Sequence, residues 1–293
     1  MKVSYYPGCT LKTTAKGLEK SAIASLASLG IVVNELPSWN CCGAVYSLAD
    51  DDLIHHLAPV RILIRVRELG NDKVFTLCSM CYNVLARVNL LMRNDEEKRM
   101  AINLFMDEEP DYHGEVEVVH FLKFLNDEVD WKKLREDIKI PLYGLKVSPY
   151  YGCMLHRPRE VAIEALGSFE LMTSLLKLLG ATVIDFPSAD RCCGSYQIIG
   201  SPEAAESATS AILESARNVR TEALALTCPL CEFNLQKTQE QMFQKKKIRA
   251  VIPTFYITQL LAIALGLGPE ICHFEMNGTG CIELLKSKGI VKI

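Results

Sequence analysis

The sequence lacks a hydrophobic run long enough to cross a membrane. Its longest apolar stretch, residues 257–267, is interrupted by Thr258 and Gln259, and it is shorter than the roughly 20 apolar residues that a spanning helix needs. The amino-terminal segment also lacks the apolar core of a secretion signal. We therefore expect a cytoplasmic protein without a membrane span.

The chain also lacks a strong excess of charge of one sign. It has 32 Lys and Arg residues against 35 Asp and Glu residues, and its formal net charge is −3. Proteins that bind nucleic acids ordinarily carry a basic surface, so we expect no nucleic-acid partner. With 49% hydrophobic and 23% charged residues over 293 positions, the composition excludes intrinsic disorder and the length suggests two domains.

Two familiar redox motifs are missing as well. No G-x-G-x-x-G motif follows a predicted strand, and Gly278-Thr279-Gly280 is too short to replace it. The C-x-x-C-x-x-C run of a ferredoxin domain is also absent. We therefore expect neither flavin nor NAD in this chain, so electrons for a redox reaction would have to come from a partner.

Cysteine, in contrast, is abundant. Because a cytosolic protein keeps its thiols reduced, the twelve cysteines are not expected to form a disulfide framework. Ten of them form two copies of one pattern, in which a single cysteine is followed by Cys-Cys-Gly and then by C-x-x-C. The first copy consists of Cys9, Cys41, Cys42, Cys78 and Cys81, and the second of Cys153, Cys192, Cys193, Cys228 and Cys231.

The repeat extends beyond the cysteines. Residues 5–9 (YYPGC) match residues 149–153 (PYYGC), and a Pro-Ser pair precedes Cys-Cys-Gly in both copies. The repeat period is about half of the chain, which indicates tandem domains and not a solenoid. We predict a duplication with a first domain at residues 1–140 and a second at residues 141–293.

Each half has the pattern of an α/β domain. Residues 15–29 have the three-and-four apolar spacing of a helix, Gly30 ends it, and residues 31–33 resemble a buried strand. Residues 169–186 repeat this unit. Such alternation predicts a mostly parallel sheet flanked by helices, with ligands at the carboxyl ends of the strands. We expect two such domains related by pseudo-two-fold symmetry, each with its three cysteine segments at one end of the sheet.

Three kinds of chemistry are open to these thiols. A lone C-x-x-C at a helix start is typical of a redox pair, but this leaves three cysteines per half unexplained. A structural zinc ion takes four ligands and leaves one thiol over. Thiolates also hold iron–sulfur clusters, and five thiols exceed the four that an ordinary cluster needs.

The Cys-Cys-Gly segment favours the iron–sulfur alternative. Adjacent side chains of an extended strand point to opposite faces, so both thiols reach one site only if the chain bends sharply. Gly43 and Gly194 permit that bend. Two adjacent thiolates suit neighbouring irons of a cluster better than one small ion. Cys272 and Cys281 lie outside the repeat, and we interpret both as buried apolar residues.

On these motifs the chain resembles the CCG-domain (cysteine-rich domain) family, and within it the B subunits of methanogen heterodisulfide reductases. The resemblance extends from Cys9 to about residue 265. It implies an oxidoreductase that reduces the mixed disulfide of coenzyme M and coenzyme B to two thiols. It also implies two non-cubane [4Fe-4S] clusters, one held by each set of five cysteines.

The same resemblance implies partners and a substrate site. The partners would be an iron–sulfur C subunit, a flavin-containing A subunit and a hydrogenase module. Because the disulfide substrate is polyanionic, cations near the cysteines are candidate substrate contacts, namely Lys12, Arg157, Arg159 and Arg191. His156 is the candidate proton donor, since an unperturbed imidazole titrates near neutrality.

Two other functions compete with this one. The first is an electron-transfer subunit of a hydroxyacid or succinate-type oxidoreductase, which would use the same cysteines without a disulfide substrate. The second is a zinc-stabilised assembly protein without redox activity.

Overall fold

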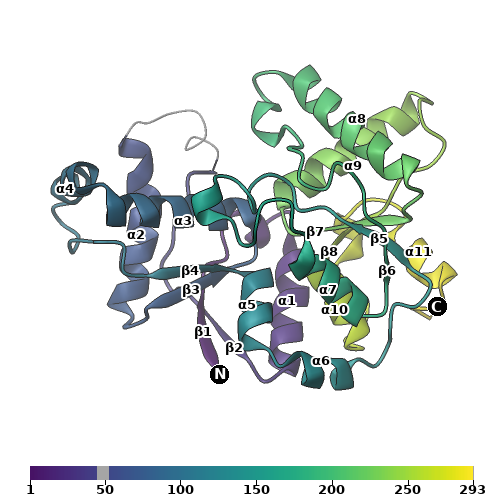
Figure 1. Cartoon of the computed structure of the whole chain (residues 1–293), viewed down its shortest axis with the longest axis horizontal. Coiled ribbons are helices and arrows are strands. Elements are labelled where there is room, and N and C mark those ends of the chain that lie inside the picture. The colour runs from purple at the N-terminus through teal and green to yellow at the C-terminus, as the bar shows by residue number, and fades with distance from the viewer. Residues whose placement is uncertain (45–52, 293) are drawn as a thin grey trace.

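The computed structural model describes residues 1–44 and 53–292, which form two α/β halves side by side (Figure 1). Each half is built on a four-stranded sheet in which all pairs are parallel. The first sheet has the order β2-β1-β3-β4 and contains β1 (Lys2–Tyr5), β2 (Val32–Glu35), β3 (Lys73–Thr76) and β4 (Glu117–His120). The second has the order β6-β5-β7-β8 and contains β5 (Lys146–Pro149), β6 (Thr182–Val183), β7 (Ala223–Leu226) and β8 (Thr254–Tyr256). The predicted tandem α/β architecture is confirmed, whereas the exact boundary after residue 140 stays a prediction.

Helices connect the strands and flank both sheets (Figure 1). Up to residue 137 they are α1 (Lys16–Ser28), α2 (Ile54–Glu68), α3 (Ser79–Asn94), α4 (Glu96–Phe105), α5 (Phe121–Glu128) and α6 (Trp131–Asp137). After it they are α7 (Glu170–Leu178), α8 (Pro202–Asn218), α9 (Pro229–Gln244), α10 (Ile257–Ala264) and α11 (Cys281–Ser287). Single helical turns also occur, among them η1 (Thr10–Lys12), η3 (Arg159–Val161), η4 (Ser195–Gln197), η5 (Glu270–Cys272) and η6 (Phe274–Met276).

The predicted helix–strand units are present, but one strand is shorter than expected, and β2 is an exposed edge strand instead of the buried strand predicted at residues 31–33. Helix α1 ends just before Gly30, which has φ +78°, and β2 starts at Val32. The strand expected over residues 181–186 is limited to the two residues of β6. Its next carbonyl, that of Ile184, accepts a hydrogen bond of 2.6 Å from Ser148 Oγ. The β5 residue that would donate to this carbonyl is Pro149, which has no N–H, so the ladder ends there.

The two halves pack around a pseudo-two-fold axis. Helix α1 of the first half packs against α10 of the second, and α7 of the second packs against α5 of the first. Because α1 and α7 are equivalent in the repeat, as are α5 and α10, the two contacts are the same contact made twice. Ser21 Oγ in α1 donates to Thr258 Oγ1 in α10 at 2.7 Å, and both side chains are buried.

The central strands of both sheets are buried, whereas the edge strands β2 and β6 are largely exposed. All four residues of β7 are buried, as expected for a strand covered by helices on both sides. In the first half, the ring of Phe75 in β3 packs between Tyr5 and Phe124, with centroids at 5.0 and 5.2 Å. These cores hold the strands rigidly, so the loops at their ends start from fixed positions.

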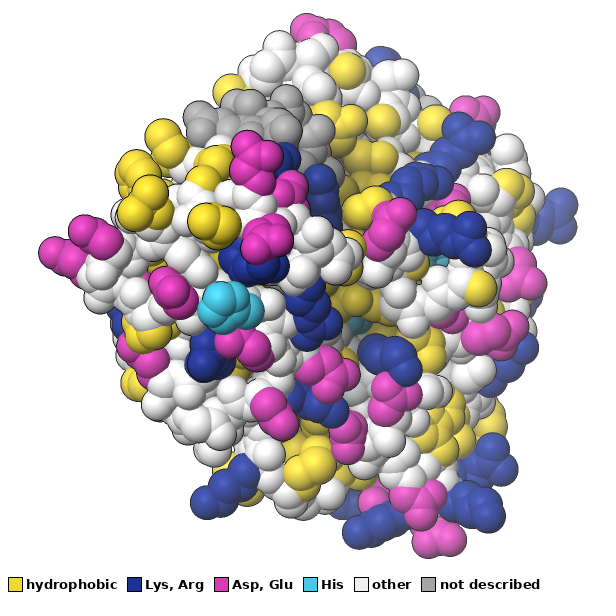
Figure 2. Space-filling model, turned by 60° about the vertical axis from the view of Figure 1, so that its left-hand side comes forward, with side chains coloured by type: hydrophobic (Ala, Val, Ile, Leu, Met, Phe, Trp, Pro, Cys, Tyr) yellow, Lys and Arg dark blue, Asp and Glu magenta, His cyan; other side chains and the backbone are white. Residues whose placement is uncertain are grey.

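The surface is mixed in charge. Figure 2 shows basic and acidic side chains interspersed over one face, and the surface contains ion pairs such as Arg61–Glu109 at 2.8 Å. Within residues 1–44 and 53–292, every helix is too short or too polar to traverse a lipid bilayer.

Candidate metal centres

Each half gathers its five cysteines at the carboxyl end of its sheet. In the first half, Cys9 follows β1, the Cys-Cys-Gly segment follows β2, and Cys78 follows β3. Cys78 is also the residue that precedes α3, and Cys228 precedes α9 in the same way. The central strands β1 and β3 are neighbours, so their following loops converge. The predicted gathering of three cysteine segments at one end of the sheet is therefore observed in both halves.

In the first half the thiols lie in close pairs. Cys9 Sγ is 3.7 Å from Cys41 Sγ, and Cys42 Sγ is 3.7 Å from Cys81 Sγ. Cys9 and Cys41 are exposed, whereas Cys42, Cys78 and Cys81 are buried. The adjacent Cys41 and Cys42 thus reach different partners within a single site, as the bend at the Cys-Cys-Gly segment predicts.

The second half repeats this arrangement in a more covered form. Cys193 Sγ is 3.4 Å from Cys231 Sγ, which is the pair equivalent to Cys42 and Cys81. Cys153 and Cys192 are half-buried, in contrast to their exposed counterparts. Gly194 adopts φ +73°, and its N–H donates to Cys192 Sγ at 3.3 Å. The glycine therefore both allows the turn and presents an amide to a thiol.

A second glycine in each half makes room for a thiol. Gly8 has φ +74°, and a Cβ at this position would lie 2.7 Å from Cys81 Sγ. Gly152 has φ +65°, and its Cβ would lie 3.2 Å from Cys231 Sγ. The glycine before the first cysteine has no side chain, and this leaves room for the thiol of the second cysteine of C-x-x-C.

In each half, a hydrogen-bonded pair of thiols has one lowered and one raised pKa. The pKa of Cys42 is lowered chiefly by its hydrogen bond with Cys41, whose own pKa is raised by the same contact. In the second half the hydrogen bond with Cys153 lowers the pKa of Cys192 to about 6, and the pKa of Cys153 is raised. Such pairs titrate as units. A metal that binds thiolates must displace the retained protons, so binding in either half would depend on pH.

The two sets of thiols meet at the pseudo-two-fold axis. Cys78 and Cys228 are close enough for a thiol–thiol hydrogen bond, which is the main cause of the lowered pKa of Cys78. Beside them Ser79 Oγ and Thr227 Oγ1 lie 2.6 Å apart and are buried. The first cysteine of each C-x-x-C motif therefore faces its equivalent in the other half.

The donor set fits an iron–sulfur group by its chemistry. All ten thiols are free, and six of them are buried at the sheet ends without a disulfide. In the described part of the chain they come together in pairs, and no three His, Cys, Asp or Glu side chains surround one point as ligands of a single ion would. An all-thiolate set of five per half suits a multi-iron group.

The predicted cations differ in their availability. Lys12 Nζ lies 2.6 Å from Glu19 and 2.5 Å from Glu35, so two carboxylates already neutralise it. Arg157 pairs with Asp190 at 3.1 Å.

The other two predicted cations, Arg159 and Arg191, are exposed. Within the described ranges neither forms an ion pair. A substrate anion would therefore meet them without first breaking a salt bridge.

His156 is fully buried three residues after Cys153, beside aromatic and acidic side chains, and it contacts no thiol among the described residues. Its ring stacks on Phe169 with centroids 5.3 Å apart and also contacts Tyr151 at 5.1 Å. Neither ring nitrogen has a hydrogen-bond partner in the described part of the chain, and Nε2 is 4.0 Å from Glu164 Oε1. Burial lowers the pKa of His156, so the neutral imidazole is favoured.

Cys272 and Cys281 lie apart from both sets. Both are buried, and burial raises the pKa of each thiol to about 12. Cys272 contacts the Gln259 carbonyl and Cys281 the Thr254 carbonyl. These positions agree with the prediction of buried apolar residues.

Sequence reasoning missed several residues that organise the site. Asn83 Nδ2 in α3 donates to the carbonyls of Met154 and Arg157 in the other half, at 2.8 and 2.7 Å. Tyr6 and Tyr150 bond the residues before each Cys-Cys pair. The tyrosines stood in the repeat itself, as YYPGC and PYYGC, and could have been found there. Asn83 has no equivalent in the second half, so the repeat in the sequence does not indicate its role.

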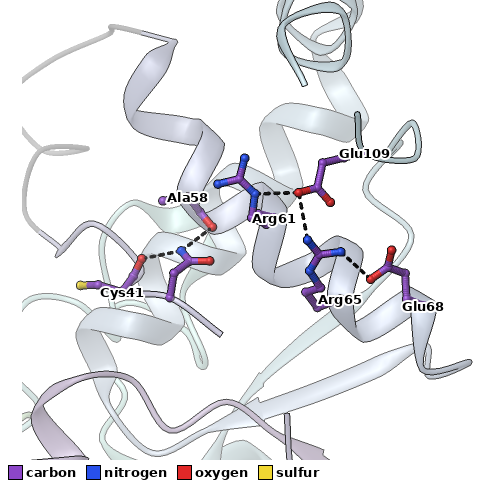
Figure 3. A network of polar contacts seen from close by, with 7 residues as sticks. Cys41, Ala58, Arg61, Arg65, Glu68 and Glu109 are labelled. Atoms are coloured by element: carbon purple, nitrogen blue, oxygen red, sulfur yellow. Dashed lines mark hydrogen bonds and ion pairs between the residues drawn. The ribbon is translucent and has the colours of Figure 1, made fainter. Parts of the chain in front are cut away.

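Asn40, the residue before Cys41, is held from a second side. Its Nδ2 donates to the carbonyls of Cys41 and Ala58, at 2.9 and 3.0 Å. Figure 3 shows Ala58 on the same helix as Arg61 and Arg65, both of which bond Glu109. Helix α2 therefore anchors the Cys-Cys turn of the first half.

These observations define a duplicated α/β protein with a thiol-lined site at the end of each sheet. The model of the CCG cysteine-rich domain matches residues 3–86 and 147–236, and the chain belongs to this family. It is 32% identical over 292 residues to the B subunit of the ferredoxin/F420H2-dependent CoB-CoM heterodisulfide reductase of Methanosarcina acetivorans, covering 97% of this chain and 96% of the relative.

A second relative comes from a different enzyme. The chain is 31% identical over 266 residues to the 8-methylmenaquinol:fumarate reductase membrane anchor subunit of Wolinella succinogenes, covering 90% of this chain and 92% of the relative. A solved structure of a Helicobacter pylori hypothetical protein has a TM-score of 0.71 at 11% identity, over 92% of this chain and 50% of that protein. This last similarity concerns the fold alone.

Proposed function

We propose that this chain is the disulfide-reducing subunit of an oxidoreductase and that its substrate is the coenzyme M–coenzyme B heterodisulfide. The observation that carries the proposal is the approach of the two five-thiol sites at one axis, where Ser79 Oγ and Thr227 Oγ1, the chain neighbours of Cys78 and Cys228, lie 2.6 Å apart. Reduction of a disulfide takes two electrons. Two adjoining one-electron sites meet that need better than either site alone.

Each half would hold one [4Fe-4S] cluster of non-cubane type. The first would bind to Cys9, Cys41, Cys42, Cys78 and Cys81, and the second to Cys153, Cys192, Cys193, Cys228 and Cys231. When bound, such clusters supply one-electron redox chemistry. The reaction adds two electrons and two protons to the substrate, breaks its S–S bond and leaves two thiols. The electrons would come from an iron–sulfur C subunit and a flavin-containing A subunit, with a hydrogenase module beyond, and the complex would work in the cytoplasm.

The cations near the cysteine segments of the two sites would bind the anionic ends of the substrate. We rank Arg159 and Arg191 first, because they are exposed and free of carboxylate partners in the described ranges. Arg157 and Lys12 would each have to exchange a carboxylate for the substrate. Replacing Arg191 by Gln should raise KM more than it lowers kcat.

We further propose His156 as the proton donor to a leaving thiolate. Its neutral form carries one N–H, and neither ring nitrogen forms a hydrogen bond among the described residues, the nearest carboxylate oxygen being that of Glu164 at 4.0 Å. His156→Gln should lower turnover while the iron content stays at the wild-type level. Full activity of this variant would remove His156 from the mechanism.

The decisive experiment titrates the anaerobically purified chain with coenzyme M–coenzyme B disulfide while the iron spectra are recorded. We expect the spectrum of at least one cluster to change, and we expect Cys42→Ala and Cys193→Ala to abolish turnover. Iron spectra that do not respond to the disulfide would refute the proposed substrate. Zinc without iron or sulfide in the purified chain would refute both redox functions.

A second function has specific support. The fumarate reductase relative is as similar to this chain as the heterodisulfide reductase relative, at 31% against 32% identity. The chain would then be an electron-transfer subunit of a succinate-type oxidoreductase. Its clusters would be reduced and reoxidised by partner proteins but would not respond to the disulfide, so the same titration separates the two functions.

A further inference from the structure

Each half contains a buried tyrosine close to its cysteine segments. The tyrosines are Tyr6, directly after β1, and Tyr150, directly after β5. Their side chains are 0% and 1% exposed. Each lies within electrostatic reach of four of the five thiols in its own half, which together with burial raises the pKa of both hydroxyls.

Both tyrosines make the same hydrogen bond. The Tyr6 hydroxyl donates to the carbonyl of Asn40 at 2.9 Å, and the Tyr150 hydroxyl donates to the carbonyl of Arg191 at 2.7 Å. Asn40 and Arg191 are the residues immediately before the two Cys-Cys pairs. The contact thus ties the loop after the central strand to the start of the Cys-Cys turn.

Each ring has an aromatic neighbour, which differs between the halves, and a glycine neighbour, which is the same in both. The Tyr6 ring lies edge-on to Trp39 at 6.0 Å, and the Tyr150 ring lies against Phe186 at 6.4 Å. A Cβ on the neighbouring glycine, Gly8 or Gly152, would come within 3.7 or 3.8 Å of the tyrosine ring. Ring, glycine and the second thiol of C-x-x-C are therefore neighbours in each half.

The other supports of the two Cys-Cys turns differ. Asn40 is also held by α2, through the Ala58 carbonyl, whereas the segment before Cys192 is held by Arg157. The tyrosine bond is present in both halves all the same. A contact that is retained while its surroundings diverge points to a shared requirement of the two sites.

We propose that Tyr6 and Tyr150 are positioning residues that set the placement of the adjacent thiols at each metal centre. The hydroxyl fixes the carbonyl before the turn, so that one thiol of the pair faces the cysteine after the central strand and the other faces the C-x-x-C motif. This role rests on the proposed clusters, and it assigns each tyrosine to the cluster of its own half.

The test compares Tyr6→Phe and Tyr150→Phe, which remove only the hydroxyl, with Tyr112→Phe as a matched control. Tyr112 is equally buried, and its hydroxyl donates to Asn89 Oδ1 at 2.6 Å and accepts from the Val116 N–H at 3.2 Å, but it belongs to none of the cysteine segments. In the metal-free chain, amide deuterium exchange at residues 40–44 should quicken up to roughly tenfold in Tyr6→Phe, the most that the loss of one hydrogen bond predicts. Exchange at residues 191–195 should respond in Tyr150→Phe.

In the iron-loaded chain, each variant should shift the electron paramagnetic resonance signal and the midpoint potential of one cluster and leave the other unchanged. Equal changes at both clusters, no change at either, or the same change in Tyr112→Phe would overturn the proposal. If the wild-type chain takes up no iron but deuterium exchange still responds locally, the proposed function is wrong while the positioning role of the two tyrosines stands. If iron binds and exchange does not respond, only the positioning role is wrong.

Discussion

Replacing Gly8 by Ala tests the close approach of backbone and thiol in the first site. Gly8 has φ +74°, which costs an alanine about 1–2 kcal/mol in conformational energy. The new Cβ would also lie 2.7 Å from Cys81 Sγ, and relieving such a contact in a packed site typically costs about 1–3 kcal/mol more. We expect a total loss of about 2–5 kcal/mol in the free energy of unfolding.

Gly30→Ala is the matched control for this variant. Gly30 has a similar φ of +78°, but a Cβ there has no heavy atom within 4 Å. It should therefore lose only the conformational part, about 1–2 kcal/mol. The difference between the two variants, measured by urea unfolding of the metal-free chain, isolates the contact with Cys81.

Iron analysis then separates stability from site geometry. After anaerobic reconstitution, Gly8→Ala should retain the second site only and bind about half of the wild-type iron, whereas Gly30→Ala should bind all of it. Gly152→Ala should show the reverse loss in milder form, since its Cβ would lie 3.2 Å from Cys231 Sγ. Equal stability and equal iron binding in Gly8→Ala and Gly30→Ala would refute the reasoning.

Three further changes have distinct expected outcomes. Asn83→Ala removes two buried hydrogen bonds between the halves and should cost about 2–4 kcal/mol in urea unfolding; a loss below about 0.5 kcal/mol, as for a neutral surface change, would contradict this. Burial lowers the pKa of His120 to about 3, below its unfolded value near 6.5. Its contribution to stability is therefore complete above pH 6.5 and should fall by about 2 kcal/mol by pH 5, a loss absent in His120→Asn. Cys272→Ala should leave the iron content unchanged, and a loss of iron would make Cys272 part of a site.

Much of the fold and the outline of the site could be predicted from the sequence. Helix α1 and strand β2 followed from the three-and-four apolar spacing of residues 15–29, the stop at Gly30 and the apolar residues 31–33. Since parallel strands end at the same edge, the convergence of the cysteine segments followed from topology alone. The duplication supplied a second copy of every signal.

The remaining features depend on contacts that no local pattern records. Strand β6 is short because Pro149 of β5 has no N–H for the Ile184 carbonyl, which Ser148 Oγ bonds instead, and the sequence does not show that these residues lie opposite each other. Asn83 reaches the other half only because the two sheets dock with α3 at the axis. The ion pair between Lys12 and Glu19 likewise depends on how η1, which contains Lys12, packs against α1, which contains Glu19. Such contacts are properties of the packed molecule.

The two halves have the same arrangement of thiols, but they differ in how far these thiols are shielded from solvent. The segment after Cys153 crosses to the first half, where Tyr82 Oη donates to the Val161 carbonyl at 3.0 Å and Asn83 holds the preceding residues. Cys153 is half-buried beside this segment, whereas its counterpart Cys9 is exposed. No equivalent segment follows Cys9, because η1 leads almost directly into α1.

This asymmetry predicts two unequal redox sites. Solvent exposure is one of the determinants of the reduction potential of a thiolate-bound cluster, and the first site presents two exposed thiols against two half-buried ones in the second. Potentiometric titration of the iron-loaded chain should therefore resolve two midpoint potentials. Cys9→Ser and Cys153→Ser should each displace a different one. A single transition that both variants displace equally would mean that the segment after Cys153 does not differentiate the sites, and that the contact at Cys78 and Cys228 makes the two halves one electronic unit.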